Sequence, residues 1–219
     1  MKRRELLAGV ASSAALAVGC HAQEKFTQEI ALPEAAVTGK VSLEDAITRR
    51  RSRRFFRPEP LPVATIGQLL WSGQGITNAA GWRAAPSAGA LYPLELYAVT
   101  ATEVMHYLPR GHKAETREAS DLRPQLRALA LEQAPVGNAP VVVVIAAEPG
   151  RLSQRYGDRA EAYTTIEVGH AGQNILLQAV ALGLVAVPIA AVDGTRAARV
   201  LGLPSAQTVF YLIPVGFMA

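Results

Sequence analysis

Residues 49–54 read Arg-Arg-Arg-Ser-Arg-Arg, and two phenylalanines follow them. Guanidinium groups present fixed forks of N–H donors that match phosphate oxygens, and a serine hydroxyl adds a short neutral hydrogen bond. The tract could therefore hold a phosphate monoester. The same composition also fits a solvated basic helix end, because arginine is favoured near a helix C-terminus. The local pattern leaves both interpretations open.

A second tract, residues 85–95, reads Ala-Pro-Ser-Ala-Gly-Ala-Leu-Tyr-Pro-Leu-Glu. Its small residues let backbone N–H groups approach a planar ligand closely, and Pro86 and Pro93 stiffen the chain on either side. Together the two tracts predict the two halves of a cradle for an anionic cofactor. Ser87 as a hydrolase nucleophile is a weaker alternative, because the chain has no Gly-x-Ser-x-Gly elbow and no assigned base.

Several other chemistries are excluded by count and spacing. Glu167 and His170 have the Glu-x-x-His spacing of di-iron bundles, but a di-iron site needs a second such pair, so a hydrogen-bonded helix histidine is favoured. Cys20 is the only cysteine, which rules out internal disulfides and cysteine metal clusters. No zinc-hydrolase, Walker-type or dinucleotide-binding motif is present.

The elements expected to carry these tracts mix helices and strands. Ser42 caps a helix that leads into the arginine tract, and a second apolar stripe, Ile66 to Leu70, ends at Gly73 or Gly75. Further along, the pattern predicts a strand pair, a helix, a buried strand, a long helix, a strand, a short helix and a last strand, at residues 94–100 with 104–108, 120–133, 141–147, 161–183, 184–192, 195–201 and 209–215.

Two of these elements carry sharper expectations. Residues 141–147 contain five consecutive β-branched residues with no polar face, which predicts a central strand covered on both sides. The long helix spans roughly 35 Å at 1.5 Å per residue. Its residues expected to face packed surroundings are Ile166, Gly169, Gln173, Asn174, Leu177 and Val180.

The N-terminus predicts export. Residues 1–22 combine Lys2-Arg3-Arg4, a short apolar run and a small residue at Ala22, and the paired arginines resemble a twin-arginine signal that directs a folded protein to the periplasm. Cys20 partly fits a lipoprotein processing site, so a lipid anchor and conventional cleavage both stay open. Residues 23–41 are expected to form a linker or extended arm, followed by one domain over 42–219. From Gln23 on, 19 basic and 17 acidic side chains leave a net charge of +2, which does not favour nucleic-acid binding.

From about Ser42 to Gly216 the sequence resembles the SagB/ThcOx-type dehydrogenase branch of the FMN-dependent nitroreductase superfamily. The landmarks include the arginine tract with Phe55, Leu69-Leu70-Trp71, the 86–95 tract and Tyr156-Gly157. Others are His106-Tyr107, Glu167-Val168-Gly169-His170 with Gln173-Asn174, and Pro214-Val215-Gly216.

The resemblance implies an α+β nitroreductase-like sandwich, a mixed but mainly antiparallel sheet flanked by helices, and a homodimer with FMN at the subunit interface. It places the FMN phosphate and ribityl chain on the arginine tract and the isoalloxazine beside the 86–89 loop. Backbone N–H groups of the 188–191 segment would face the flavin N5 region. The predicted cofactor contacts are therefore Arg50, Arg51, Ser52, Arg54, Pro86, Ser87, Ala88, Gly89, Pro188, Ile189, Ala190 and Ala191.

One departure bears on catalysis. The family often has a Lys-Tyr pair implicated in peptide azoline oxidation, and here Arg155-Tyr156 occupies those positions. Arginine stays protonated and cannot accept a proton, so azoline oxidation is not predicted and Tyr156 is the candidate for proton transfer. The function expected is an exported FMN-dependent oxidoreductase acting on a small organic substrate. The alternative is a non-catalytic exported flavin- or ligand-binding module on the same fold.

Overall fold

A seven-stranded sheet runs through the computed structural model, which describes residues 26–219. Its order is β1-β4-β3-β2-β5-β7-β6, and neighbouring strands pair antiparallel. The strands are β1 (Gln28–Ala31), β2 (Leu94–Val99), β3 (Glu103–Leu108), β4 (Lys113–Glu118), β5 (Val141–Ala147), β6 (Val185–Ala186) and β7 (Thr208–Gly216). The predicted α+β architecture with a mainly antiparallel sheet is confirmed.

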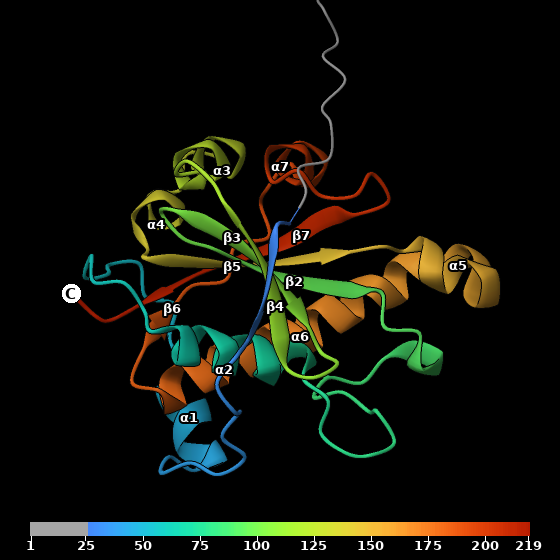
Figure 1. The fold of residues 1–219 in the computed structure, drawn as a ribbon, viewed down its shortest axis with the longest axis horizontal. Coiled ribbons are helices and arrows are strands. Elements are labelled where there is room, and N and C mark those ends of the chain that lie inside the picture. The colour runs from blue at the N-terminus through green and yellow to red at the C-terminus, as the bar shows by residue number, and fades with distance from the viewer. Residues whose placement is uncertain (1–25) are drawn as a thin grey trace, which may run out of the picture.

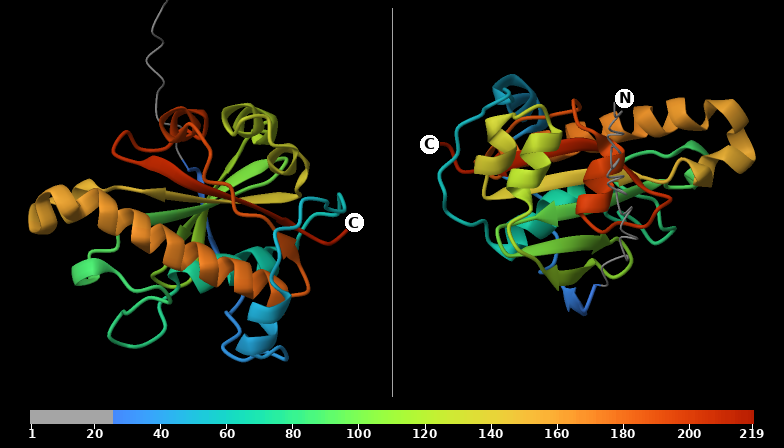
Figure 2. Two further views of the ribbon diagram at one scale, coloured as in Figure 1. Left: turned by 180° about the vertical axis from the view of Figure 1, so that it is seen from behind. Right: turned by 90° about the horizontal axis from the view of Figure 1, so that it is seen from above.

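Helices cover both faces of this sheet (Figure 1). The face with α2 (Val63–Gln74) and α6 (Ala160–Ala181) also carries α1 (Leu43–Arg49), which packs near the C-terminal end of α6. The opposite face carries α3 (Arg123–Leu129), α4 (Ala134–Asn138) and α7 (Gly194–Val200). Figure 2 shows that α5 (Gly150–Tyr156) and the N-terminal part of α6 extend beyond the sheet at one end. Among residues 26–219, no helix has the length and apolar character needed to cross a bilayer.

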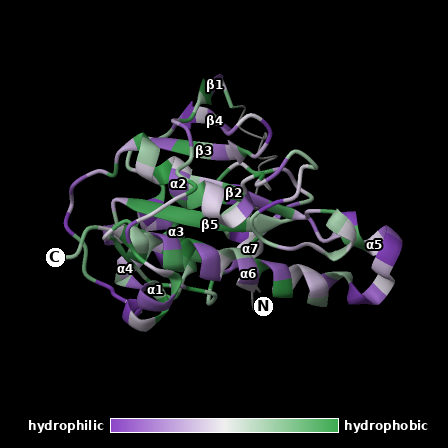
Figure 3. Ribbon diagram, turned by 90° about the horizontal axis from the view of Figure 1, so that it is seen from below, coloured by the Kyte–Doolittle hydropathy of each residue, from purple (hydrophilic) through white to green (hydrophobic). Residues whose placement is uncertain are grey.

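Strand β5 is the centre of the core, as its sequence predicts. All seven of its residues are buried, and it lies between β2 and β7. Because side chains alternate along a strand, Val143 and Ile145 pack in the cluster that contains α2 and α6 residues. Val142 and Val144 pack in the cluster of the α3 and α7 face. Figure 3 shows β5 as an apolar strand, with more polar residues toward the β4 edge.

The predicted helix boundaries near the arginine tract are confirmed. The Ser42 hydroxyl accepts a hydrogen bond from Asp45 N–H, which caps α1, and Arg50 follows as its last capping residue. Helix α2 ends at Gly75, where a Cβ would collide with the Trp71 ring, so only glycine fits. The α1 end therefore delivers the arginine tract to a fixed place beside the sheet.

Several segments differ from expectation, and strand β4 and helix α5 were not predicted. The 120–133 helix is shorter, because Leu131 and Glu132 take positive φ and end it. The 184–192 strand is reduced to β6, since Pro188 lacks an N–H to donate, although Ile189 still bridges to Leu212. Residues 28–31 of the predicted arm form edge strand β1 on β4, a strand that was not predicted.

The prediction of which α6 face is packed is wrong for the single chain. Ile166, Gly169 and Gln173 are exposed, and Ile166 keeps 54% of its surface. The buried face lies about half a turn away at 100° per residue, and most of its residues are small or apolar. The residues of the buried face are Thr164, Glu167, Val168, Ala171, Gly172, Ile175, Leu176 and Ala179.

Candidate functional site

The arginine tract is an extended segment that lies beside β6. Ser52 forms a parallel bridge with Ala186, and Arg53 N–H donates to the Ala186 carbonyl at 3.0 Å. Further on, Arg57 N–H donates to the Phe217 carbonyl, which ties the tract to the end of β7. Phe55 is 80% exposed, whereas Phe56 is half-buried. The backbone of the tract is thus fixed while most of its guanidinium groups reach outward.

A groove of about 470 Å³ opens between this tract and the C-terminal part of α6. Arg50 and Arg51, two of the predicted cofactor contacts, line it, and so does Arg53, which was not in the predicted set. Arg51 also donates to the Thr48 and Arg50 carbonyls at 3.0 and 2.8 Å, so it helps to cap α1. Ser52 and Arg54 are exposed nearby and do not line the groove in the single chain.

The predicted 188–191 segment lies on the same side of the molecule as the tract. It follows β6, which pairs with Ser52, and Ile189 exchanges backbone hydrogen bonds with Leu212 on β7. Ala190 and Ala191 are exposed. Their N–H groups donate to no backbone group within residues 26–219, so two donors there are open to a ligand.

The 86–89 loop is held in a tight turn. The Ser87 hydroxyl accepts a hydrogen bond from Tyr92 N–H at 2.8 Å, and Ala88 N–H donates to Glu167 Oε1 at 2.8 Å. Gly89 has φ of +60°, and a Cβ there would lie 2.9 Å from both the Arg155 guanidinium and the Tyr156 hydroxyl. The structure therefore places the Tyr156 hydroxyl beside the 86–89 loop.

The two predicted halves of the cradle lie at different ends of α6. The 86–88 loop lines a cavity with Tyr163, Ile166 and His170, whereas the groove of the arginine tract contacts Leu176 and Val180. Thirteen residues separate Glu167 from Val180, which is roughly 20 Å along a helix. Figure 1 shows α1 and the 86–93 region near opposite ends of α6. One chain alone does not bring the two halves together.

Glu167 is the buried member of the Glu-x-x-His pair. Its side chain lies beside the cavity of about 290 Å³ that Ser87, Ala88 and His170 help to line, and the residue is only 4% exposed. Burial raises the pKa of Glu167, although the hydrogen bond from Ala88 N–H, the nearby Ser87 hydroxyl and the His170 charge oppose this. The sequence singled out its spacing but predicted no site role for it.

An ionic cluster fixes the other end of the 86–95 tract. Glu95 on β2 contacts His106 Nε2 at 2.9 Å and Arg151 Nη2 at 2.6 Å. Arg151 also contacts Glu148 and donates to the Tyr92 carbonyl. Burial alone would raise the pKa of Glu95, but the His106 hydrogen bond and the Arg151 charge hold it below its ordinary value.

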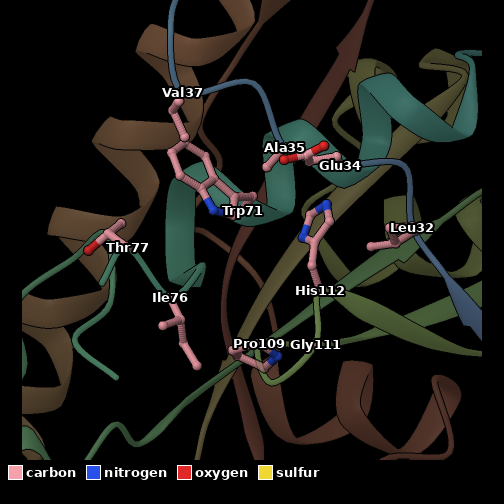
Figure 4. Close-up of a pocket in the computed structure, with 10 residues that line it drawn as sticks. All are labelled: Leu32, Glu34, Ala35, Val37, Trp71, Ile76, Thr77, Pro109, Gly111 and His112. Atoms are coloured by element: carbon pink, nitrogen blue, oxygen red, sulfur yellow. The ribbon is translucent and has the colours of Figure 1, made fainter. Parts of the chain in front are cut away.

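A separate cavity of about 700 Å³ contains none of the predicted site residues (Figure 4). Trp71 of α2, His112 of the β3–β4 turn and the arm around Leu32 line it. His112 contacts the Tyr107 hydroxyl at 2.9 Å and the Pro33 carbonyl at 3.0 Å, so it ties the arm to the sheet. In the described part of the chain, no group of three or more His, Cys, Asp or Glu side chains could hold a metal ion.

Comparison with known proteins matches residues 47–217 to the family model described as "Nitroreductase family". A Methanocaldococcus jannaschii protein named "Putative nitroreductase" is 35% identical over 196 residues, covering 87% of this chain and 96% of its own length. A crystal structure from Ralstonia eutropha with the same description has a TM-score of 0.77 at 24% identity and covers 90% of this chain and 93% of that one.

A more distant structural neighbour is the NADPH:FMN oxidoreductase from Vibrio harveyi in complex with NAD+. It has a TM-score of 0.61 at 22% identity, and the match covers 80% of this chain and 68% of that one. Such likenesses show the fold, and they agree with the mainly antiparallel sheet flanked by helices described above.

Proposed function

Because this chain belongs to the nitroreductase family, whose members are flavin-dependent oxidoreductases, we propose that it is an FMN-dependent oxidoreductase acting on a small organic substrate. The observation that carries the proposal is the fixed arginine tract beside open backbone donors. Five guanidinium groups gather there, and the Ala190 and Ala191 N–H groups are free on the adjacent segment. A phosphate-bearing planar cofactor needs both features.

The residues present fit FMN. The groove volume lies within the range of about 300–1,000 Å³ typical of ligand pockets. Arg50, which lines the groove, and Ser52 and Arg54, which are exposed beside it, would hold the phosphate and ribityl chain, and the 190–191 N–H groups would donate to the ring edge. Bound FMN would supply the electron transfer, so the chain's own part is to bind the cofactor, orient it and exclude water.

The direct test is a visible absorption spectrum of the purified protein, followed by anaerobic titration with dithionite. Flavin bands near stoichiometry that bleach on reduction are expected. A colourless protein that also fails to take up added FMN would remove the oxidoreductase proposal. Flavin that binds but is not reoxidised by quinones or nitroaromatic compounds would favour the non-catalytic module.

The complete site is proposed to form between two copies of the chain. An antiparallel arrangement of two α6 helices would bring the arginine tract of one copy to the 86–89 loop of the other. Apolar side chains on α1 and α6 that face solvent support this arrangement: Leu43 is 60% exposed, Ile47 54% and Ile166 54%. In a dimer these residues would gain the packed surroundings expected of the long helix.

Replacing Ile166 with glutamate is expected to convert the dimer to a monomer, because burying an unpaired carboxylate at an interface is costly. Light scattering after gel filtration would measure the mass, and bound flavin should fall with it. Leu131→Glu is the matched control, because Leu131 is 77% exposed at the end of α3 on the opposite face of the sheet. A monomeric wild-type protein that binds FMN fully would exclude the shared site.

Tyr156 is proposed to serve in proton transfer. Its hydroxyl lies beside Gly89 and its ring packs against Tyr163 at 5.1 Å. Tyr156→Phe should leave the flavin spectrum unchanged and slow steady-state turnover by about a hundredfold, which is typical for loss of a general acid. Tyr163→Phe is the control, because it removes a hydroxyl from the neighbouring ring and leaves the ring packing in place. Equal turnover in wild type and Tyr156→Phe would exclude the role.

The finer assignments stay proposals. Resemblance of the 86–95 tract and Tyr156-Gly157 supports the SagB/ThcOx-type branch. Export is supported by the sequence pattern of residues 1–22, and a lipid anchor by Cys20. Residues 1–22, which include Cys20, lie outside the described residues. An exported enzyme would fold around FMN before transport and would need a reductant other than a cytoplasmic nicotinamide pool.

A further inference from the structure

Two side chains of helix α6 form hydrogen bonds with the backbone of the segment that leads into the 86–89 loop. Glu167 Oε1 accepts the Ala88 N–H at 2.8 Å, and Asn174 Nδ2 donates to the Ala84 carbonyl at 3.2 Å. Glu167 and Asn174 are seven residues apart, which places them on one helix face two turns from each other. Residues 84–88 are therefore tied at both ends to the same rigid element.

The two bonds serve backbone groups that the segment cannot satisfy by itself. Ala88 begins a short 3-10 turn, Ala88–Ala90, so its N–H has no acceptor within the turn. Ala84 also donates its N–H to the Gly75 carbonyl, which ties the segment to the end of α2. The loop is thus fixed by α6 and α2 in addition to the hydrogen bond between Ser87 and Tyr92 within it.

Only one carboxylate oxygen of Glu167 accepts the hydrogen bond from Ala88 N–H. Its second oxygen, Oε2, is buried and has no hydrogen-bond partner among the described residues. The Ser87 hydroxyl, His170 of α6 and Arg83 of the preceding loop influence the carboxyl group, and Tyr163 lines the same cavity. A glutamine could accept the same Ala88 N–H without burying a charge, and buried polar atoms left unpaired are uncommon.

We propose that Glu167 and Asn174 are positioning residues that hold the 84–88 segment in the geometry with which it meets the flavin, Glu167 through Ala88 N–H and Asn174 through the Ala84 carbonyl. The flavin contact rests on the proposed function, whereas the two hydrogen bonds to the 84–88 segment do not depend on it. Because the backbone bond is what Glu167 contributes, an amide at position 167 should replace it and an apolar side chain should not.

Hydrogen exchange of the peptide covering residues 84–92 tests the two hydrogen bonds to α6 without any flavin. Glu167→Ala and Asn174→Ala should each raise its exchange rate by about tenfold, the usual consequence of losing one well-formed hydrogen bond. Glu167→Gln and the control Glu161→Ala, an exposed residue of the same helix, should stay within about twofold of the wild type. Unchanged exchange in Glu167→Ala and Asn174→Ala would overturn the proposal.

FMN affinity then tests whether these hydrogen bonds contribute to cofactor binding. Glu167→Ala should weaken FMN binding about tenfold and shift the flavin absorption bands, and Glu167→Gln should restore both. If Glu167→Ala exchanges faster at residues 84–92 but keeps the wild-type FMN affinity and spectrum, the claim that the segment is held for the flavin would be overturned. A wild-type protein that binds no FMN would instead remove the proposed function. The exchange rates would still show whether Glu167 and Asn174 hold the 84–88 segment.

Discussion

Removing Arg50 and Arg54 together, as Arg50→Ala with Arg54→Ala, is expected to release FMN on purification. Each guanidinium would make charge-assisted hydrogen bonds to the phosphate, so losing two should weaken binding by about 10²–10⁴-fold. The visible spectrum of the purified variant and a fluorescence titration with FMN measure the effect. The fold should persist, because the tract is held by backbone bonds from residues 52, 53 and 57.

The alternation of an extended segment supplies a matched control. Residues 50, 52 and 54 alternate with residues 51 and 53 along the extended segment, although Arg50, Arg51 and Arg53 all line the groove. Arg51→Ala with Arg53→Ala removes the same two charges, and Arg51 is already engaged with the Thr48 and Arg50 carbonyls. Loss of FMN in this variant with retention in the first would assign the phosphate to Arg51 and Arg53, which also line the groove.

The sequence predicted well those elements whose pattern reports burial directly. The unbroken apolar run at 141–147 identified the central strand, and Ser42 identified the start of α1. Strand β4 was missed because its sequence, Lys-Ala-Glu-Thr-Arg-Glu, has one apolar residue and looks like a solvated loop. Its burial comes from pairing between β1 and β3, which is a tertiary effect that local propensity does not carry.

The sequence indicated the two candidate segments but not how they are arranged. Residue types predicted two segments for binding an anionic cofactor, which stays a prediction, and nothing in their spacing showed that they lie at different ends of α6. The exposed face of α6 was taken as buried for a related reason: Ile166 and Leu177 form an apolar stripe, and a stripe packed against a second copy has the same pattern as one packed against the sheet. Glu167 was not assigned a role because its partner, Ala88 N–H, is 79 residues away.

Glu95→Gln is expected to destabilise the protein by about 2 kcal/mol at neutral pH. Removing one member of a buried ion pair typically costs about 3–5 kcal/mol, and the value is reduced here because Arg151 is partly exposed and keeps Glu148. Urea unfolding followed by circular dichroism measures the change. Glu115→Gln is the control, because Glu115 contacts the same histidine at a longer 3.4 Å with a side chain 40% exposed, and it should cost about 0.5 kcal/mol.

The pH dependence of this difference follows from the pKa of Glu95, which is lower in the folded protein than its ordinary value of 4.5. The unfolded chain therefore binds a proton more readily, so the carboxylate stabilises the folded state fully above about pH 4.5. As the pH falls through the lowered pKa of the folded state, Glu95 becomes protonated and that contribution disappears. The unfolding free energies of wild type and Glu95→Gln should converge in acid, and a difference that stays constant down to the acid limit would show that packing, not charge, accounts for the loss.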